Sequence, residues 1–518
     1  MAGGADGLRR VSTQAQGTIG SMNYALDASD FATDGLRPQS SARRDTGYLK
    51  LSHPYDNGRV AVIVNRQTGT AQDPLGLSRA EFAANPYQTT PSASTFDTRK
   101  RFDQTQLGAA WEHRLGGGQR LELMGYVGRR AITQYQAITP TAQVAPSSPG
   151  GVIDLDRSYG GINAHWHIDR EWGAGRLTAS AGLASDLQDE WRRGFDNFAG
   201  AATAPSQLGV TGRLRRDERN TATTLDPYAQ IEWDSALWTV IAGLRQSYVR
   251  MSSTDNYVAA GNPDDSGSSE YSGMMPVLGL RYRLNDMLQA YASAGLGFET
   301  PTLNEVAYRA SGAGGLNSQL QASRSRNSEV GLRVRHADWG WTGTLFDTRT
   351  DNEIGVLSNI GGRSTFQNAG RSLRQGLEVS VDGRWGGISL TGALTLMEAT
   401  YPAGNRMPGV PGKKLYVHLT WEPKTLPGVF TMDMRHMGQI TANDTNSDAA
   451  DAYTTVNLGG QFQQISGAWQ WKEFVRIDNV ANRVYAGSVI VNEGNGRYFE
   501  PAAGRSAYVG VEIERRFP

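Results

Sequence analysis

The feature that most constrains the fold is a regular alternation of connections between about twenty short amphipathic segments. Tight turns, such as Gly116 to Gly118 and Asn285-Asp286, separate one pair of segments. Long polar stretches, such as Thr68 to Phe102 and Gln188 to Thr221, separate the next pair. A chain that crosses a slab repeatedly, with plain turns on one side and large loops on the other, has this layout. The alternation predicts an all-β fold, a transmembrane antiparallel β-barrel.

Within the segments, apolar and polar residues alternate with the period of a β-strand. Leu377, Val379 and Val381, for example, are separated by Glu378 and Ser380. A soluble sandwich shows the same alternation, so the pattern alone does not distinguish a lipid-facing surface from a core. Segment length favours the barrel, because most segments run about nine to fourteen residues, enough to cross a bilayer at a tilt. The predicted strands lie near residues 7–16, 20–29, 43–52, 58–66, 103–114, 119–131, 156–169, 175–187, 223–233, 237–250, 272–284, 287–298, 325–336, 340–351, 374–384, 388–401, 414–422, 428–437, 453–464, 468–480 and 505–517.

Tryptophan positions indicate where the membrane surface lies. Every tryptophan except Trp191 falls in, or within about four residues of, a predicted tight turn. Aromatic rings favour the headgroup level, so this placement predicts an interfacial girdle at the turn end. The last segment is amphipathic and carries Phe517 before the final Pro518. This ending resembles the recognition signal of outer-membrane barrel assembly, whose members usually end on the aromatic residue itself.

Composition excludes several other classes. The 51 basic and 51 acidic residues balance, whereas nucleic-acid binders usually carry a basic excess, so we expect no nucleic-acid partner. The chain has 0 cysteines, which excludes disulfides and thiolate metal sites. No run approaches the roughly 18 apolar residues of a membrane helix, and residues 1–6 lack the features of a signal peptide. Nucleophile elbows, phosphate-binding glycine loops and zinc-protease motifs are also lacking, so we expect no enzyme.

Five sets of segments, in order and spacing, resemble the TonB-dependent outer-membrane receptors, especially the ferric-siderophore branch. One set, Asp73 to Leu77, is similar to an early-loop motif of ferric-citrate-like members. The others are Ala294 to Glu305, Phe366 to Gly370 with Gly376 to Glu378, Arg476 to Val480 with Tyr485, and Gly496 to Pro501 with Gly504 and Arg505.

The resemblance implies a barrel of 22 strands, of which about 21 are counted here. A barrel of this kind has an even strand number and a periplasmic N-terminus. We therefore expect residues 1–518 to be the barrel region, with the signal peptide, the lumen-filling plug and the first strand absent. The implied location is the bacterial outer membrane. The implied partners are a ferric siderophore or similar chelate, the TonB complex through a plug not present in this chain, and outer-membrane lipid and lipopolysaccharide.

The implied function is TonB-coupled uptake of a ferric siderophore, with ferric iron only as part of the ligand and no resident cofactor or metal. Ferric chelates are often anionic and bulky, which suits arginine forks and aromatic rings in the long loops. Any one of these side chains could instead serve only loop packing, and Arg333 and Arg335 are expected to hold a plug in the lumen. The candidate ligand-binding residues are Arg79, Tyr87, Arg99, Tyr308, Arg309, Arg324, Tyr401, Arg406, Arg497 and Tyr498.

Three other patterns are weaker. Asp444, Asn446 and Asp448 have the spacing of a calcium loop, but Ala449 and Thr455 replace its expected glycine and glutamate. The cluster Arg213, Arg215 and Arg216 stands beside Asp217 and Glu218, which predicts a solvated loop of mixed charge. His165 and His167 share a strand face without an evident third ligand.

Three alternatives remain open at this point. A passive porin-like channel would have the same alternation of turns and loops. A haem or other scarce-nutrient receptor would share the barrel, although no histidine occurs between Glu299 and Arg335, where haem receptors typically carry one. An envelope enzyme or adhesin on a barrel scaffold is the third.

Overall fold

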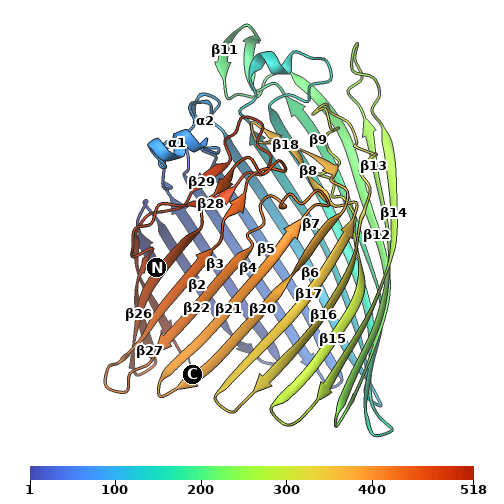
Figure 1. The fold of residues 1–518 in the computed structure, drawn as a ribbon, viewed down its shortest axis with the longest axis vertical. Helices are drawn as coiled ribbons and strands as arrows, with labels where there is room; N and C mark the ends of the chain where they lie inside the picture. The colour runs from blue at the N-terminus through green and yellow to red at the C-terminus, as the bar shows by residue number, and fades with distance from the viewer. Residues whose placement is uncertain (518) are drawn as a thin grey trace.

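Twenty-two antiparallel strands close into a barrel in the computed structural model, which describes residues 1–517 (Figure 1). Each barrel strand pairs with the next one along the chain, and β1 completes the ring by pairing with both β2 and β30. The barrel strands are β1 (Ala2–Gly4), β2 (Arg9–Ile19), β3 (Met22–Thr33), β4 (Ala42–Tyr55), β5 (Gly58–Gln72), β6 (Arg99–Gly116), β7 (Gln119–Tyr135), β8 (Val152–Trp172), β9 (Gly175–Phe195), β12 (Leu214–Ser235), β13 (Trp238–Asp255), β14 (Gly267–Arg283), β15 (Leu288–Glu299), β16 (Ser323–Arg335), β17 (Trp339–Asp351), β20 (Ser372–Trp385), β21 (Ile388–Thr400), β22 (Lys413–Trp421), β23 (Gly428–Met437), β26 (Tyr453–Ser466), β27 (Trp469–Asp478) and β30 (Ser506–Arg515).

Short elements within the long connections cover one end of the barrel (Figure 1). Four are two-stranded hairpins: β10 (Phe198–Ala201) with β11 (Ala204–Leu208), β18 (Ile354–Ile360) with β19 (Arg363–Asn368), β24 (Ile440–Thr441) with β25 (Ala449–Ala450), and β28 (Ala486–Val489) with β29 (Phe499–Pro501). The helices are α1 (Arg79–Ala84), α2 (Pro91–Thr95) and the single 3₁₀ turn η1 (Pro140–Gln143). None of the helices in residues 1–517 has the length and apolar character to span a membrane.

All 21 predicted strands are present, and the closed all-β barrel is confirmed. The strand count was one short, because β1 has only three residues, Ala2 to Gly4, and so shows no alternation that a sequence pattern can detect. Within residues 1–517, β1 takes the position of the 22nd strand, and the expectation about residues that precede Met1 stays a prediction. β1 pairs Ala2 with Gly510 of β30 and with Arg10 of β2.

The predicted strand lengths were too short on one side of the barrel. β8 and β9 each have 21 residues and β12 has 22, so these strands continue well past the membrane on the loop side. The connection predicted at Gln188 to Thr221 is mostly strand, because β9 runs to Phe195, β12 begins at Leu214, and the β10–β11 hairpin lies between them. On the turn side the prediction is accurate. Gly116, Gly117 and Gly118 have φ angles of 85°, 58° and 75°, a conformation that favours glycine.

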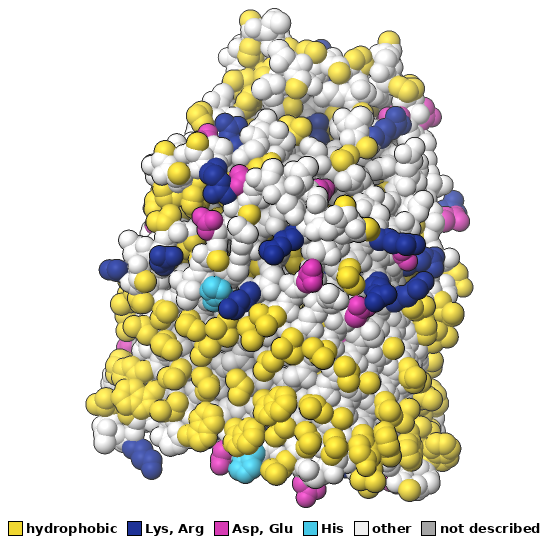
Figure 2. Space-filling view, in the orientation of Figure 1, with side chains coloured by type: hydrophobic (Ala, Val, Ile, Leu, Met, Phe, Trp, Pro, Cys, Tyr) yellow, Lys and Arg dark blue, Asp and Glu magenta, His cyan; other side chains and the backbone are white. Residues whose placement is uncertain are grey.

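The outer face carries an apolar belt over the turn half of the barrel (Figure 2). Register places the predicted girdle tryptophans on this face. Trp341 pairs with Val381, and Trp471 pairs with Ile513, so each of these tryptophans lies beside an apolar residue on the same face. A band of basic and acidic side chains lies directly above the belt on the loop side (Figure 2). The belt fits the hydrocarbon region, and the charged band fits the polar layer above it.

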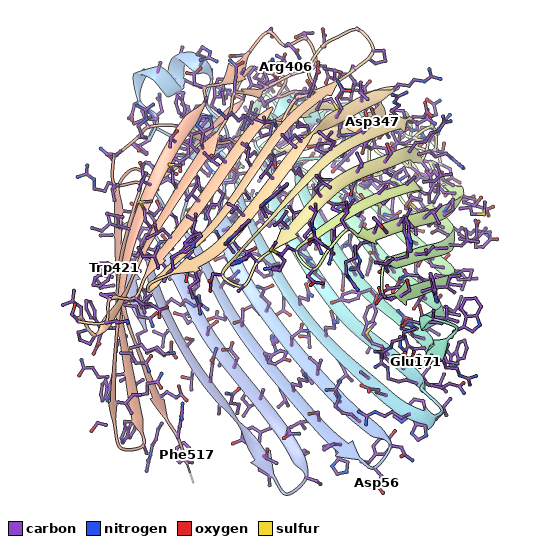
Figure 3. The ribbon with its side chains drawn as sticks, turned by 60° about the horizontal axis from the view of Figure 1, so that its bottom comes forward. Asp56, Glu171, Asp347, Arg406, Trp421 and Phe517 are labelled. Carbon is purple, nitrogen blue, oxygen red and sulfur yellow. The ribbon has the colours of Figure 1, made fainter. Side chains whose placement is uncertain are left out.

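The lumen face is polar, and several tyrosine rings on it lie over glycines of the neighbouring strand. The directly paired residues are Tyr126 with Gly161, Tyr159 with Gly128, Tyr228 with Gly182 and Tyr291 with Gly331. A Cβ added at Gly128, Gly182 or Gly331 would lie 2.4 Å from its tyrosine ring. Arg335 pairs with Asp382 at 3.2 Å on the same face, and Figure 3 views this interior from the turn end. The predicted role of Arg335 toward a plug remains a prediction.

Candidate ligand-binding site

The long connections interlock above the lumen into one layer, which we call the cap (residues 73–98, 136–151, 301–322, 352–371, 401–412, 438–452 and 479–505). Leu77 and Phe499 exchange backbone hydrogen bonds of 2.8 and 3.0 Å. The Asn359 amide donates to Asn492 O at 3.0 Å, and the Ala137 amide donates to Gly361 O at 3.1 Å. Segments hundreds of residues apart therefore support one another.

Arg79, Arg497 and Tyr498 meet in one part of the cap, around α1 and the β28–β29 hairpin. The α1 helix begins with a capping box between Ser78 and Glu81. Glu81 also pairs with Arg497 at 3.4 Å, and burial, which raises its pKa, is outweighed by the Ser78 and Arg497 hydrogen bonds, so the pKa of Glu81 is lowered. Arg79 reaches the neighbouring loop: its Nε donates to Asp448 Oδ1 at 2.9 Å, and its guanidinium lies 4.9 Å from the Phe499 ring centroid.

Tyr498 completes this group, since its hydroxyl accepts a hydrogen bond of 3.0 Å from Asn443 Nδ2. Tyr87 lies half-buried nearby, where a Cβ on Gly504 would come within 3.1 Å of its hydroxyl.

Tyr401 and Arg406 form a second group, on the connection between β21 and β22. Burial first, and then the negative charge of Asp444, raise the pKa of Tyr401 to about 12. The Arg406 amide donates to Asn446 Oδ1 at 2.7 Å, while its side chain projects from the loop end (Figure 3). The polar residues at 444–448 are used here to hold other loops: Asp448 binds Arg79, and Asn446 binds Arg406.

Arg99 and Arg324 lie apart from both groups, on the outer wall. Arg99 stacks on Tyr135 with its guanidinium 3.6 Å from the ring centroid, and donates to Asp97 at 2.7 Å. Arg324 donates to Ser272 O at 2.9 Å. It borders a cavity of about 480 Å³ that opens where β14 and β15 stop pairing beyond Val277 and Gly295. The lining residues that face this cavity include Ser268, Ser272, Phe298, Gln321 and Asn352.

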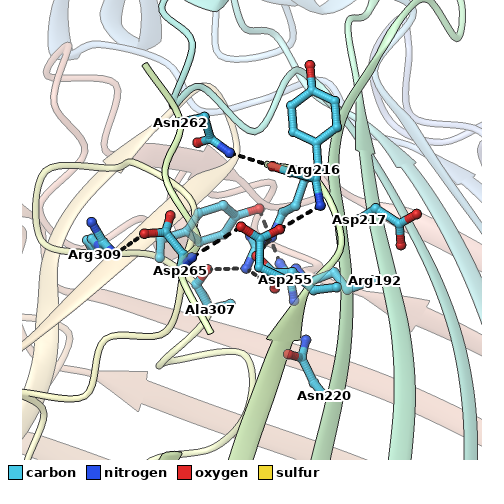
Figure 4. A network of polar contacts seen from close by, with 12 residues as sticks. Arg192, Arg216, Asp217, Asn220, Asp255, Asn262, Asp265, Ala307 and Arg309 are labelled. Carbon is cyan, nitrogen blue, oxygen red and sulfur yellow. Dashed lines mark hydrogen bonds and ion pairs between the residues drawn. The ribbon is translucent and has the colours of Figure 1, made fainter. Parts of the chain in front are cut away.

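Tyr308 and Arg309 lie on the connection between β15 and β16. Arg309 forms an ion pair with Asp265 of the connection that precedes β14. Tyr308, by contrast, is only 5% exposed, and three guanidiniums face its ring: Arg192 at 5.2 Å, Arg216 at 5.1 Å and Arg363 at 5.1 Å from the centroid. Figure 4 shows part of this network from close by.

The prediction of a solvated loop at Arg213 to Glu218 is wrong for most of its members. Arg213 is 72% exposed, but Arg216 is 5% exposed and Glu218 is 3% exposed. Arg216 donates to both oxygens of Glu218, at 2.5 and 2.7 Å, and to Ala307 O at 2.7 Å. The reason is that β12 continues through this segment, so its residues pack beneath the cap instead of facing water.

A second buried carboxylate lies beneath the first. Glu190 of β9 is 0% exposed, accepts from Arg157 Nε at 3.0 Å, and stands 3.8 Å from Arg192 Nη1, too far for a hydrogen bond. One nitrogen of each of the three arginines around Tyr308 is buried without a hydrogen-bond partner in residues 1–517: Arg192 Nη1, Arg216 Nη1 and Arg363 Nε. Buried polar nitrogens left unpaired are uncommon and call for an explanation.

The tyrosine at the centre is electrostatically unusual. Burial would raise the pKa of Tyr308, but the positive charges of Arg192, Arg363 and Arg216 outweigh it and lower the pKa to about 8. Sequence analysis named Tyr308 as a candidate, assigned Arg216 to a solvated loop, and missed Arg192 and Arg363. The signal that could have found Arg216 is the strand period itself, because Glu218 and Asn220 continue the inward-facing series of Tyr228. No sequence signal links Arg363, which comes from a different hairpin.

Comparison with known proteins matches residues 28–486 to the family described as "TonB dependent receptor-like, beta-barrel". The ferric citrate transporter FecA, in its unliganded form, superposes with a TM-score of 0.80 at 15% identity, over 99% of this chain and 78% of that one. The ferric yersiniabactin uptake receptor FyuA from Yersinia pestis gives 0.78 at 16%, over 100% and 79%. The copper transporter OprC gives 0.77 at 13%, over 98% and 79%. At these identities the structural likeness establishes the fold.

Fold, belt and cap together define an outer-membrane β-barrel of the receptor and transporter class. The family match extends over most of the sequence and agrees with the ring of 22 strands. The chain belongs to the TonB-dependent receptor β-barrel family, and it is an outer-membrane protein.

Proposed function

We propose that this barrel captures a ferric siderophore, or a similar anionic metal chelate, on its extracellular cap. The observation that carries the proposal is the chemistry of the cap and of the wall that it contacts, where guanidiniums repeatedly lie against aromatic rings, as Arg79 does with Phe499 and Arg216 does with Tyr308. Guanidinium forks suit the carboxylate and phenolate oxygens of chelates, and rings suit their flat faces. FecA and FyuA, two proteins of the same fold, are described as a ferric citrate transporter and a ferric yersiniabactin uptake receptor.

The linked loops suggest how capture at the cap would lead to uptake. Ligand contact with one connection alters others, because hydrogen bonds such as Asn359 to Asn492 and Arg79 to Asp448 join them. By family membership, we propose that TonB supplies the energy for transport through a plug domain that is not among the described residues. The role of this chain is then to recognise the ligand and to form the wall of the pathway.

Lipopolysaccharide is the proposed surface partner. Arg324, Arg326, Arg349 and Arg371 lie above the apolar belt near the loop-side ends of β16, β17 and β20, where the phosphates of the outer leaflet would lie. Register supports this placement. Arg326 pairs with Arg349, and Leu332, which lies on the same face of β16 as Arg326, is part of the apolar belt. Arginine clusters at this level attract phosphates. Arg326→Glu with Arg349→Glu should reduce the lipopolysaccharide that co-purifies with the barrel, and an unchanged amount would contradict the contact.

Binding by the refolded chain in detergent tests the main proposal. Tryptophan fluorescence should be quenched saturably by at least one ferric chelate from a panel of a tris-catecholate, a dicitrate and a trihydroxamate. Saturable quenching by cupric ion alone would favour a copper receptor, the candidate suggested by the likeness to OprC. Quenching by haemin alone would favour a haem receptor. If no member of the panel binds, the siderophore proposal fails, and the porin-like channel becomes the better explanation.

A further inference from the structure

Three parts of the molecule converge on Tyr308. Arg192 comes from β9 and Arg216 from β12, both from the wall of the barrel above the membrane. Arg363 comes from the β18–β19 hairpin and donates to Gly150 O. Tyr308 itself is supplied by the connection at residues 301–322, and its hydroxyl accepts a hydrogen bond of 3.2 Å from Arg192 Nη2. The phenol is thus the shared partner of three cations from three different segments.

The negative charge around these cations is insufficient. Arg157, Arg192, Arg216 and Arg363 contribute four positive charges, and the two carboxylates bound to them, Glu190 and Glu218, contribute two negative ones. Among residues 1–517, no carboxylate lies within ion-pair distance of Arg363. Asp255 and Asp265 line a small cavity together with Arg215, Arg216 and Glu218, but neither is within ion-pair distance of the three arginines in residues 1–517, and Asp265 is already paired with Arg309.

Buried cations without anions are costly, so a site of this kind is usually completed by an anionic partner. The unpaired nitrogens Arg192 Nη1 and Arg216 Nη1 belong to side chains that are 4% and 5% exposed. They are therefore withheld from water as well as from protein acceptors. Of the groups now in place, only the Tyr308 phenol stands where such an anion would be.

The Tyr308 segment, residues 301–322, is tied to its surroundings at several points, and only some of these contacts involve the three arginines. Leu303, Val306 and Leu320 pack against Val249 and Met251 of β13. The segment is also bonded to its neighbours where the Tyr271 hydroxyl donates to Leu320 O at 2.9 Å, the Gly314 amide donates to Ser147 O at 3.2 Å, and Arg309 pairs with Asp265. Its direct bonds to the arginines are two: Arg216 to Ala307 O at 2.7 Å and Arg192 to the Tyr308 hydroxyl. A ligand that replaces these two bonds compensates for the loss.

We propose that Arg192, Arg216 and Arg363 form a subsite for an aryl-oxide group, a phenolate or catecholate of the bound chelate, and that Tyr308 occupies this subsite until the ligand displaces it. The inference rests on the proposed function and names its ligand class. An aromatic ring bearing an oxygen is the group that already fits between the three guanidiniums. An aryl oxide of the ligand would keep the ring contacts and supply the negative charge that the neutral phenol lacks.

Affinity measurements on refolded full-length variants test the subsite. Tyr308→Phe keeps the ring and removes the competing oxygen, so the affinity for a ferric tris-catecholate should rise roughly threefold to tenfold. Arg363→Gln should lower that affinity roughly tenfold or more, and should have less effect on a ferric trihydroxamate, which has no aryl oxide. Arg213→Gln, which removes an exposed arginine from the same stretch of chain, is the matched control and should bind like the parent.

Hydrogen exchange supplies a readout that a purely structural tyrosine would not change. Saturating gallium tris-catecholate should speed amide exchange around Tyr308, because displacement of its side chain breaks the bonds at Ala307 and Tyr308, whereas a trihydroxamate should not. If Tyr308→Phe lowered the affinity for every chelate equally, the subsite would be overturned, and Tyr308 would serve only to hold its loop in place. A dicitrate that responds to Arg363→Gln while the catecholate does not would overturn the aryl-oxide assignment. Failure of all chelates to bind the parent chain would instead reject the proposed function.

Discussion

Substituting Gly128 by alanine should destabilise the barrel through one identifiable collision. A Cβ at Gly128 would lie 2.4 Å from Tyr159 Cζ and 2.5 Å from its hydroxyl oxygen, whereas carbon atoms in contact lie about 3.5–4.0 Å apart. The ring cannot yield freely, because its hydroxyl accepts from Gln104 at 3.0 Å and donates to Gln106 at 3.1 Å. Overpacking of this kind costs about 1–3 kcal/mol, and the loss of one hydrogen bond adds about 1 kcal/mol. We therefore expect Gly128→Ala to lower the free energy of unfolding by about 2–4 kcal/mol.

A double-mutant cycle isolates the collision. In a Tyr159→Ala background, Gly128→Ala should be neutral or stabilising by about 0.5 kcal/mol, because alanine is favoured over glycine inside a strand. Urea unfolding of the refolded barrel in detergent, followed by tryptophan fluorescence, measures all four proteins. Gly47→Ala is the control, since a Cβ there meets nothing within 4 Å. An equal loss of stability with and without the tyrosine would show that the ring is not the cause, and the reasoning would be refuted.

Three further outcomes concern titration of the cap. Hydrogen bonds from Ser78 and Arg497 lower the pKa of Glu81, so the contribution of this carboxylate is complete above the ordinary range of a glutamate and is lost as the pH falls below it. Limited proteolysis near α1 should therefore accelerate in acid, and less so in Glu81→Gln. Burial and then Asp444 raise the pKa of Tyr401 to about 12, so its contribution holds at neutral pH and fades as the pH rises from 10 toward 12. The difference in tyrosinate absorbance between the parent and Tyr401→Phe should have its midpoint near 12. The pKa of Tyr308 is lowered to about 8, so its contact with the three arginines strengthens as the pH rises from 8 to 10. The difference in tyrosinate absorbance between the parent and Tyr308→Phe should have its midpoint near 8. A midpoint at the ordinary pKa of a tyrosine would contradict the three-arginine environment.

The sequence was sufficient for the wall of the barrel and for its orientation. Period-two alternation is a local property, so segments such as 428–437 could be located without any knowledge of their neighbours. Girdle positions such as Trp421 followed for the same reason, because a tight turn and an aromatic residue are close in the sequence. β1 could not be located this way, since three residues are too few to show a period.

The cap could not be predicted, because its contacts are not local. Arg79 and Asp448 are 369 residues apart, and Arg497 and Glu81 are 416 apart, so no window of sequence contains both partners. Composition was misleading at Arg216 and Glu218, where neighbouring opposite charges suggested exposure. The strand continues through them and buries the pair, which is a consequence of tertiary structure that charge content does not reveal.

The tyrosines that lie over glycines have a consequence for whatever occupies the interior. Their rings are laid along the wall and their hydroxyls are engaged by strand neighbours, as Tyr126 is by Asp186 and Tyr228 is by Asn163. Side chains of this size would otherwise project toward the barrel axis and leave free hydroxyls there. From β7 to β15, these phenols are therefore not free contacts for a neighbouring surface. A body in the lumen would have to make its polar attachments to this arc through charged side chains such as Glu122 and Arg245, which are partly exposed.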